Sequence, residues 1–337
     1  MRRVLPLLLA VTSVAGCASL PGAAPVVPPT ETWAFTAPWD PRSAASLRAN
    51  AAILHAAVTG WFALDTLSGQ VTTPYADDAV RSAAFAGTRL AMVTTFAGGR
   101  FRPETIRLLA GDSGGLRGVA RDIARRARAG GYAGLVLDLE DVPRADSLAL
   151  QAVAASITSA AHDAGVAPVM IALPATDSLS YPARRFPGVD LFLVMLYDQH
   201  WATSAPGPIA DPEWARRVLT SRVAEIGAGK ILAGLPLYGY RWRAGEAFAE
   251  TIGWRDAGVL AAAAGVPLER DAGSLTLHAT NTAGPPWELW VSDGVLLDAL
   301  TRVVREAGVW RVALWRLGLE DPATWSQSAL RPSAAQP

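Results

Sequence analysis

The sequence predicts an α/β fold, a (β/α)8 TIM barrel, on three observations. Short apolar, β-rich runs alternate along the chain with segments whose apolar residues recur at helical spacing. There are eight such runs, and their polar and aromatic residues gather at the carboxyl-terminal ends, where barrels of this kind carry their functional residues. The span 31–327 has a normal length for a single barrel.

Each element follows from its local pattern. The expected strands are Thr32–Thr36, Ile53–Phe62, Arg89–Phe96, Gly134–Glu140, Pro168–Pro174, Leu191–Tyr197, Lys230–Tyr238 and Val312–Leu317. The clearest helices are expected at Leu116–Ala129, Asp146–Ala164, Asp211–Ile226 and Asp293–Ala307. Gly130 and Gly131 are a stop signal for the first of these helices.

A long segment, about 243–291, separates the seventh and eighth expected strands and exceeds the usual length of a connecting loop. It contains the alternating stretch Trp287-Glu288-Leu289-Trp290, which is typical of a strand. We therefore expect a small β-containing insertion that walls one side of a groove. An irregular surface excursion is the alternative, because surface loops tolerate insertions.

The first residues predict a lipoprotein signal peptide, 1–16. Two arginines precede an apolar run that is too short to span a bilayer, and Val14-Ala15-Gly16-Cys17 looks like a bacterial lipobox. Cys17 would then be the acylated first residue of a mature protein tethered to the cell envelope outside the cytoplasm. Ala18 follows it, which resembles lipoproteins that are sent on to an outer membrane. An ordinary signal peptide with an incidental thiol is the alternative. The Pro/Ala-rich span 17–30 predicts a tether, and 328–337 a disordered tail.

Charge and composition exclude several classes of function. Thirty Lys and Arg balance thirty Asp and Glu without a basic block, so we expect no nucleic-acid partner. A single cysteine allows neither an internal disulfide nor a cysteine metal cluster, and the four histidines lack metal-ligand spacing. We expect no metal, no organic cofactor and a monomer.

The run from Gly134 to Glu140 is an apolar strand that ends in two carboxylates. Asp138 and Glu140 are two residues apart, so they share a face about 6.6 Å apart along the strand. Two carboxyl groups side by side against an apolar wall push one pKa upward. Glycoside hydrolysis needs one protonated and one ionised carboxyl. A solvated strand end or a helix cap is the alternative.

Four segments, in strand order, carry further motifs. They are Ala133–Glu140, Met195-Leu196-Tyr197-Asp198, Gly234-Leu235-Pro236-Leu237-Tyr238-Gly239 and Trp315. Together they resemble family-18 glycoside hydrolases, the chitinases and related N-acetylglucosaminidases, whose strands four, six, seven and eight carry Asp-Gly-x-Asp-x-Asp-x-Glu, Met-x-Tyr-Asp, Gly-x-Pro-x-Tyr-Gly and a tryptophan. The resemblance covers nearly all of the chain after Cys17.

The resemblance implies a retaining, substrate-assisted cleavage of a β-linked N-acetylglucosamine polysaccharide. Glu140 would be the general acid, and Asp138 would orient the N-acetyl group, whose oxygen is the nucleophile. Tyr197 would bind the acetamido group. The implied substrate-binding residues are Asp198, Tyr238, Trp315, Trp39 and Trp201. Tyr197 and the tryptophans could equally be core packing.

One departure from the family pattern keeps a second function open. Val136 and Ala133 replace two aspartates of the strand-four motif, and Val136 shares a face with the acidic pair. The alternative is therefore a catalytically weak or inactive, glycan-binding lipoprotein on the same barrel. An unrelated barrel enzyme with paired carboxylates is a third, less favoured possibility, which the Tyr197 motif argues against. The polymer, its linkage and endo or exo action stay open.

Overall fold

The structure is a computed structural model that describes residues 28–65, 67–75, 85–327 and 330. Eight parallel strands close into a barrel, because the first pairs with both the eighth and the second. In barrel order they are β1 (Glu31–Phe35), β2 (Ala56–Leu64), β4 (Thr88–Thr94), β7 (Gly134–Asp138), β8 (Val169–Pro174), β9 (Leu191–Met195), β10 (Ile231–Pro236) and β16 (Arg311–Trp315). The predicted (β/α)8 TIM barrel is confirmed, and each expected strand overlaps one of these eight.

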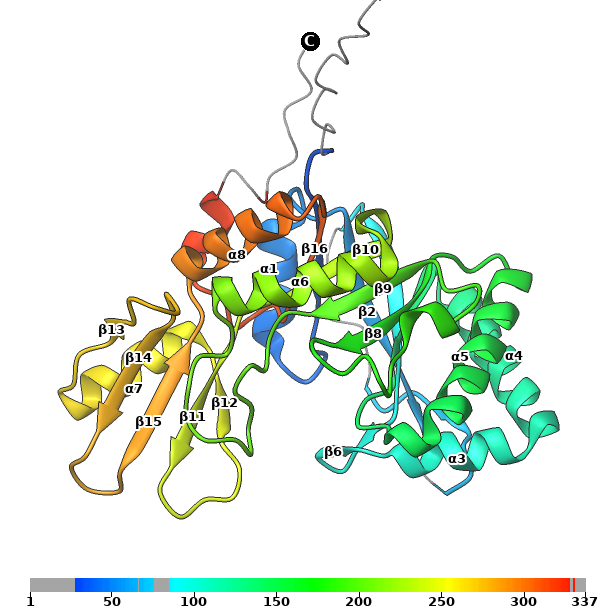
Figure 1. Cartoon of the computed structure of the whole chain (residues 1–337), viewed down its shortest axis with the longest axis horizontal. Coiled ribbons are helices and arrows are strands. Elements are labelled where there is room, and N and C mark those ends of the chain that lie inside the picture. Colours follow the sequence, from blue (N-terminus) through cyan, green and yellow to red (C-terminus); the bar gives the residue numbers. More distant parts are fainter. Residues whose placement is uncertain (1–27, 66, 76–84, 328–329, 331–337) are drawn as a thin grey trace, which may run out of the picture.

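Helices pack around the outside of the barrel (Figure 1). The α-helices are α1 (Pro41–Asn50), α3 (Pro103–Gly111), α4 (Ser113–Ala129), α5 (Ser147–Asp163), α6 (Pro212–Ile226), α7 (Trp254–Ala264) and α8 (Gly294–Glu306), and short 3-10 helices are η1 (Arg144–Asp146), η2 (Ala183–Arg185), η3 (Ala228–Lys230) and η4 (Pro322–Ser326). The four expected helices correspond to α4, α5, α6 and α8. Three of these begin at an aspartate, Asp112, Asp211 or Asp293, whose side chain accepts a first-turn backbone N–H.

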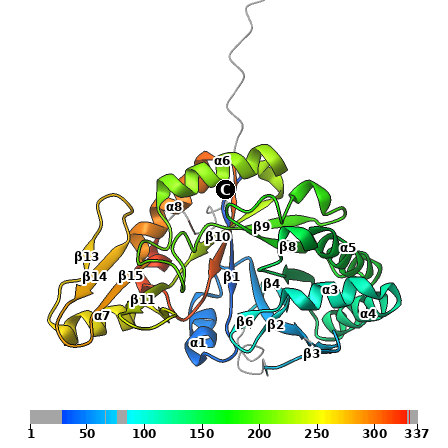
Figure 2. The same cartoon turned by 60° about the horizontal axis from the view of Figure 1, so that its bottom comes forward.

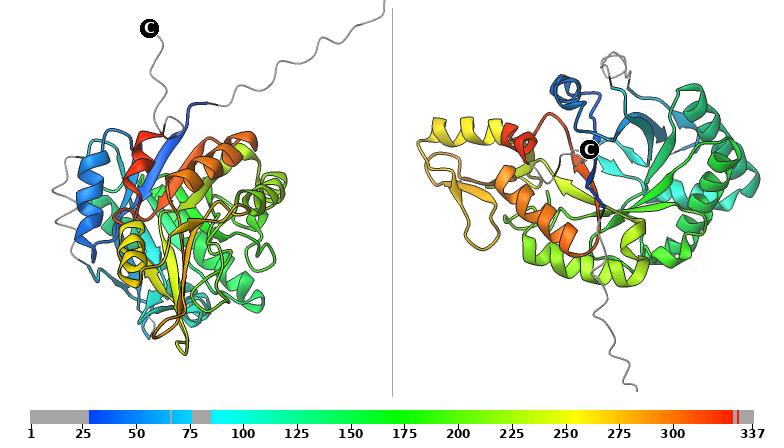
Figure 3. Two further views of the ribbon diagram at one scale, coloured as in Figure 1. Left: turned by 90° about the vertical axis from the view of Figure 1, so that its left-hand side faces the viewer. Right: turned by 90° about the horizontal axis from the view of Figure 1, so that it is seen from above.

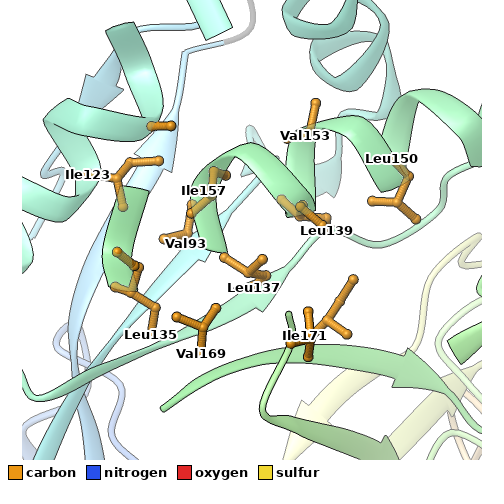
Figure 4. Packing of buried hydrophobic residues seen from close by; sticks show 14 of the residues in the cluster. Val93, Ile123, Leu135, Leu137, Leu139, Leu150, Val153, Ile157, Val169 and Ile171 are labelled. Atoms are coloured by element: carbon orange, nitrogen blue, oxygen red, sulfur yellow. The ribbon is translucent and has the colours of Figure 1, made fainter. Parts of the chain in front are cut away.

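The strands are buried on both faces, which is why they read as continuous apolar runs. In β7, Leu135 and Leu137 point outward and pack with Ile157 of α5 and Ile123 of α4 (Figure 4). Val136 points inward, into a separate cluster that fills the barrel interior. This alternation fixes the direction of Asp138, because a residue two positions after Val136 also faces inward.

The expected insertion is a five-stranded antiparallel sheet, in the order β12-β11-β15-β14-β13, that packs on α7. Its strands are β11 (Gly239–Arg243), β12 (Glu250–Ile252), β13 (Glu269–Arg270), β14 (Leu277–Asn281) and β15 (Trp287–Val291). It lies on the side of the barrel away from α3, α4 and α5 (Figure 2). The sheet starts at Gly239, so the insertion begins a few residues before the expected position of about 243, and the expected seventh strand corresponds to β10.

The barrel has two distinct ends. β1 begins at Glu31, whose N–H bonds the Trp310 carbonyl (2.8 Å) at the end drawn uppermost in Figure 1. The carboxyl ends of the strands face the opposite way, where β3 (Val71–Thr72) and the hairpin of β5 (Phe96–Ala97) and β6 (Arg100–Phe101) follow barrel strands. Seen from above, the insertion projects to one side of the ring of strands and helices (Figure 3).

Several sequence predictions lie outside the described residues. These are the signal peptide, Cys17, the tether up to residue 27 and most of the tail. Within the described part of the chain, none of the helices combines the length and apolar character needed to cross a membrane.

Candidate active site

An acidic pair lies where β7 ends at the barrel mouth. Asp138 is the last residue of β7, and its carboxyl is hydrogen-bonded to that of Glu140. The hydroxyl of Thr94, the last residue of the neighbouring strand β4, donates to Oδ2 of Asp138 (3.0 Å). Asp138 is buried and Glu140 is half-buried, so Glu140 is the more accessible of the two carboxyls.

Their electrostatics differ in a way that separates their roles. Burial raises the pKa of Asp138 to about 6, although the hydrogen bonds from Glu140 and Thr94 pull it down. Burial and the neighbouring Asp138 charge hold the pKa of Glu140 well above its usual range. When the pair holds a single proton, these shifts favour Glu140 as its site, which is the arrangement that a general acid needs.

A third carboxyl stands at the end of β9. Asp198 has a left-handed backbone (φ 56°), which aspartate tolerates better than most residues, and it accepts hydrogen bonds from the hydroxyls of Tyr238 and Tyr240. It keeps exposed surface at the mouth. The protein around the carboxyl nevertheless raises its pKa to about 6, and the two tyrosine hydrogen bonds offset this only in part.

Tyr197 lies beside the acidic residues and is buried. Its ring meets Tyr238 edge-on, with 6.1 Å between ring centroids. The ring also packs over the backbone of Gly234, where a Cβ would stand 3.0 Å from Tyr197 Cε1. Burial, followed by the negative charges of Glu140 and Asp138, raises the pKa of Tyr197 well above its usual range, so the hydroxyl stays protonated and can donate.

An aromatic cluster covers the opposite side of the mouth. Trp315, at the end of β16, contacts Phe35 (5.3 Å between centroids) and Trp61 (6.4 Å). Trp61 in turn meets Trp39 (4.8 Å) and Tyr75 (6.2 Å) edge-on. Trp61 is buried, whereas Trp39 is 47% exposed, so Trp39 offers an accessible aromatic surface supported by the buried ring of Trp61.

An ion pair between Arg316 and Asp40 lies against this aromatic cluster. Arg316 bonds Oδ2 of Asp40 (3.0 Å), and its guanidinium lies 5.7 Å from the centre of the Trp39 ring. Asp40 is also paired with Arg42, which reaches Asp256 in α7 (2.9 Å). The loop after β1 is thereby tied to both β16 and the insertion.

The predicted site residue Trp201 makes its hydrogen bonds within its own loop, and not with the acidic pair. It is half-exposed on the loop after β9, and its Nε1 donates to Thr203 (2.9 Å). The same loop docks on the insertion, because Trp242 Nε1 donates to the Ser204 carbonyl (3.0 Å) and the Ala249 N–H to the Ala202 carbonyl (2.7 Å). The insertion therefore positions this loop. Trp33, in contrast, is buried in the barrel interior.

Sequence reasoning missed Thr94, Tyr240, Tyr75 and Arg316 as parts of this site. Thr94 and Arg316 stand at or directly after the ends of barrel strands, so the strand-end rule could have indicated them. Within the described ranges, no group of three histidine, cysteine or acidic side chains could hold a metal ion.

The fold and site define a (β/α)8 barrel with a hydrogen-bonded pair of carboxyl groups at the end of its fourth strand. No family model matches the chain. The chain is 27% identical over 252 residues to the Bacillus subtilis protein named "Putative sporulation-specific glycosylase YdhD". This match covers 71% of this chain and 60% of that protein. The chain spans about 60% of the length of the first curated relatives that it matches.

Solved structures show the same fold. The spore cortex-lytic enzyme SleL of Bacillus cereus aligns with a TM-score of 0.77 at 19% identity, over 90% of this chain and 74% of that chain. A class V chitinase of Pseudomonas fluorescens Pf-5 has the same TM-score at 23% identity, over 89% and 98%. A class V chitinase of Nicotiana tobaccum, solved in complex with NAG4, aligns at 0.70 and 16%, over 90% and 98%.

Proposed function

We propose that this chain is a retaining glycosidase that cleaves a β-linked, N-acetylglucosamine-containing polysaccharide with assistance from the substrate. Glu140 is the general acid, and Asp138 orients the acetamido group of the sugar. The observation that carries the proposal is the hydrogen-bonded pair of Asp138 and Glu140 at the end of β7, in which burial and the Asp138 charge hold the pKa of Glu140 well above its usual range. The glycosylases, chitinase and cortex-lytic enzyme that the chain resembles support the reaction class.

The position of Asp138 favours a nucleophile supplied by the substrate. A retaining enzyme with its own nucleophile places a second carboxylate across the scissile bond, about 5–5.5 Å from the acid. The Asp138 carboxyl is instead hydrogen-bonded to the Glu140 carboxyl, so the two groups lie on the same side of the mouth. In our proposal the acetamido oxygen attacks the anomeric carbon while the Glu140 proton moves to the leaving oxygen, and the resulting carboxylate then activates the water.

The surrounding side chains suit an acetamido group and a pyranose ring. The protonated Tyr197 hydroxyl is a donor beside Asp138, and Asp198 and Tyr238 line the same mouth. Trp315 presents a partly exposed ring that can support the apolar face of a sugar. Trp39 and Trp201 are exposed aromatic rings farther out, where additional sugar units would stack.

The experiment is hydrolysis of N-acetylglucosamine oligomers by protein lacking residues 1–17, alongside Glu140→Gln. Glutamine preserves the size of the side chain but has no proton to give, so we expect hydrolysis to fall by 10²–10⁴-fold while oligomer binding persists. Glu288→Gln, on β15 of the insertion, is the matched control and should retain full activity. Equal hydrolysis by Glu140→Gln and the parent protein would exclude Glu140 as the acid.

One observation favours the second candidate, glycan binding without turnover. Val136 is fully buried between Met92 and Met170 of the adjacent strands, so the barrel interior beneath Asp138 is apolar. If the parent protein and Glu140→Gln both bind oligomers and neither hydrolyses them, glycan binding would replace hydrolysis as the function.

We further propose that acylated Cys17 anchors the protein in the cell envelope, outside the cytoplasm. The lipobox-like sequence supports the anchor. The direction of the barrel strands agrees with such an anchor, because β1 starts at the end of the barrel opposite the mouth. The site would then face away from the bilayer. Labelled palmitate should enter the parent protein but not Cys17→Ser. Equal labelling of both would overturn the anchor and leave the hydrolysis test unaffected.

A further inference from the structure

Thr94 is an uncharged hydrogen-bond partner of the acidic pair. It is the last residue of β4, it is buried, and it lies directly opposite Asp138 in the parallel register of β4 and β7. Its Oγ1 is 3.0 Å from Oδ2 of Asp138. The contact therefore comes from two paired strands, not from a loop, and its geometry is set by the barrel.

The direction of this hydrogen bond follows from the charge of Asp138, because an ionised carboxylate has no proton to give, and a second hydrogen bond agrees with it. The backbone N–H of Phe96 donates to Oγ1 of Thr94 at 3.0 Å, so the hydroxyl oxygen is already an acceptor there. A hydroxyl has one proton to give, and Asp138 Oδ2 is the acceptor within reach. Thr94 consequently donates to Asp138 and makes Asp138 an acceptor.

Little else polar supports Asp138. The position two residues earlier on the same face is Val136, which packs against the apolar barrel interior. Among the described residues, the hydrogen bonds that act on the Asp138 carboxyl come from Glu140 and Thr94. If one carboxylate oxygen of Asp138 accepts a hydrogen bond from Thr94, the carboxylate can also accept a hydrogen bond from the protonated carboxyl of Glu140.

We propose that Thr94 is a positioning residue that holds Asp138 as a hydrogen-bond acceptor and so assigns the proton shared by the two carboxyls to Glu140. Its catalytic consequence rests on the proposed glycosidase function. No bond to Thr94 forms or breaks in the reaction. Its hydroxyl keeps its own proton while the Glu140 proton passes to the leaving oxygen.

The proposal predicts the sign of a pH effect. A donated hydrogen bond stabilises the ionised form of Asp138 and lowers its pKa, as the neighbouring Glu140 also does. The other titratable groups that act on the pair in the described structure keep their identity on substitution at Thr94; they are Asp141, Asp198, Tyr181, Tyr197 and Tyr240. Loss of the hydroxyl should therefore raise the apparent pKa of the pair's lower step by about one unit.

The experiment compares Thr94→Val and Thr94→Ala, which remove the hydroxyl, with Thr94→Ser, which keeps it. The pH profile of kcat/KM should lose activity on its acidic side about one pH unit higher in the first two variants, and serine should restore the parent profile. Thr95→Val is the matched control, because Thr95 is equally buried and its hydroxyl has no hydrogen-bond partner in the described structure. It should leave the profile unchanged.

A second readout does not need catalysis. In protein labelled with ¹³C at the aspartate carboxyls, the Asp138 resonance, assigned by its loss in Asp138→Asn, should titrate about one unit higher in Thr94→Val. An unchanged titration in both hydroxyl-free variants, or the same shift in Thr94→Ser, would overturn the role of Thr94. Absence of hydrolysis by the parent protein would instead count against the proposed function, because the ¹³C titration would still decide the role of Thr94.

Discussion

The hydroxyl of Tyr238 donates a hydrogen bond to Oδ1 of Asp198, and this contact joins the segments that follow β10 and β9 at the barrel mouth. Tyr240 supplies a second hydrogen bond to the same carboxyl from β11, the first strand of the insertion. The Asp198 carboxyl thus connects the ends of two barrel strands to the inserted sheet. Its pKa depends on the hydrogen bonds from both tyrosines.

Tyr238→Phe should raise the pKa of Asp198 above its present value of about 6, because the largest hydrogen bond that stabilises the carboxylate is lost. If Asp198 must be ionised to bind substrate, oligomer affinity should then decline at a higher pH in Tyr238→Phe than in the parent protein as the pH falls. Titration calorimetry between pH 5 and 8 measures this. Asp198→Asn is the reference, since it removes the titration, and identical pH profiles for the phenylalanine variant and the parent would contradict the prediction.

The buried acid Asp138 should make the fold less stable as the pH rises. Its pKa is 3.8 in the unfolded chain and about 6 in the folded protein, so the folded state binds more protons between these values. The free energy of unfolding should fall from about pH 4 to 6, by at most about 3 kcal/mol for this group. Urea unfolding across this range should show a flatter profile for Asp138→Asn.

The matched control for that measurement is Asp65→Asn. The pKa of Asp65 is lowered by hydrogen bonds from Ser68 and Leu67, so its contribution has the opposite sign and is lost as the pH falls. A profile for Asp138→Asn that is as steep as the parent profile would show that the carboxyl is not buried in its charged form.

Trp39→Ala should weaken oligosaccharide binding with little effect on stability. The ring is about half exposed and rests on Trp61, so its loss removes a stacking surface and leaves the buried cluster in place. Loss of one aromatic contact is expected to cost about 1–1.5 kcal/mol, or roughly tenfold in Kd. Trp310→Ala is the control, because Trp310 directly precedes β16 at the far end of the barrel. Equal losses in both variants would exclude Trp39 as a sugar-binding platform.

The acidic pair could be predicted from sequence because its signal is local. An apolar strand that ends in two carboxylates separated by one residue fixes their common face without any knowledge of tertiary structure. Thr94 could not be found in this way. Its contact with Asp138 spans 44 residues and depends on the register of β4 with β7, and a single threonine at a strand end has many ordinary explanations.

The start of the insertion also required tertiary information. The sequence places it at about residue 243, but the antiparallel strand β11 already begins at Gly239. A Cβ at Gly239 would lie 2.0 Å from the carbonyl oxygen of Trp290, so the glycine permits the close approach of β15. Helices α1, α3 and α7 were not among the clearest helices predicted, and in α1 and α7 the serine- and alanine-rich sequences lack a strong apolar stripe.

Arg222 is a fully buried cation on α6 that fixes the carboxyl end of β8. Its guanidinium donates to the carbonyls of Pro174 (2.6 Å) and Ala175 (3.3 Å) and is paired with Glu225 (2.8 Å). Arg222→Met would leave two carbonyls and a carboxylate without these donors, so we expect a loss of about 3–5 kcal/mol in the free energy of unfolding.

Arg217→Met, on the same helix, should change the free energy of unfolding by less than about 0.5 kcal/mol. Its ion pair with Glu213 spans 3.6 Å, and both side chains are exposed to solvent, where screening and side-chain entropy remove most of the attraction. Urea unfolding of the two methionine variants at pH 7 compares the same chemical change at a buried and an exposed site. A similar, small effect at both positions would show that α6 and the β8 loop relax around a missing arginine, and that Arg222 does not determine the position of this end of the barrel.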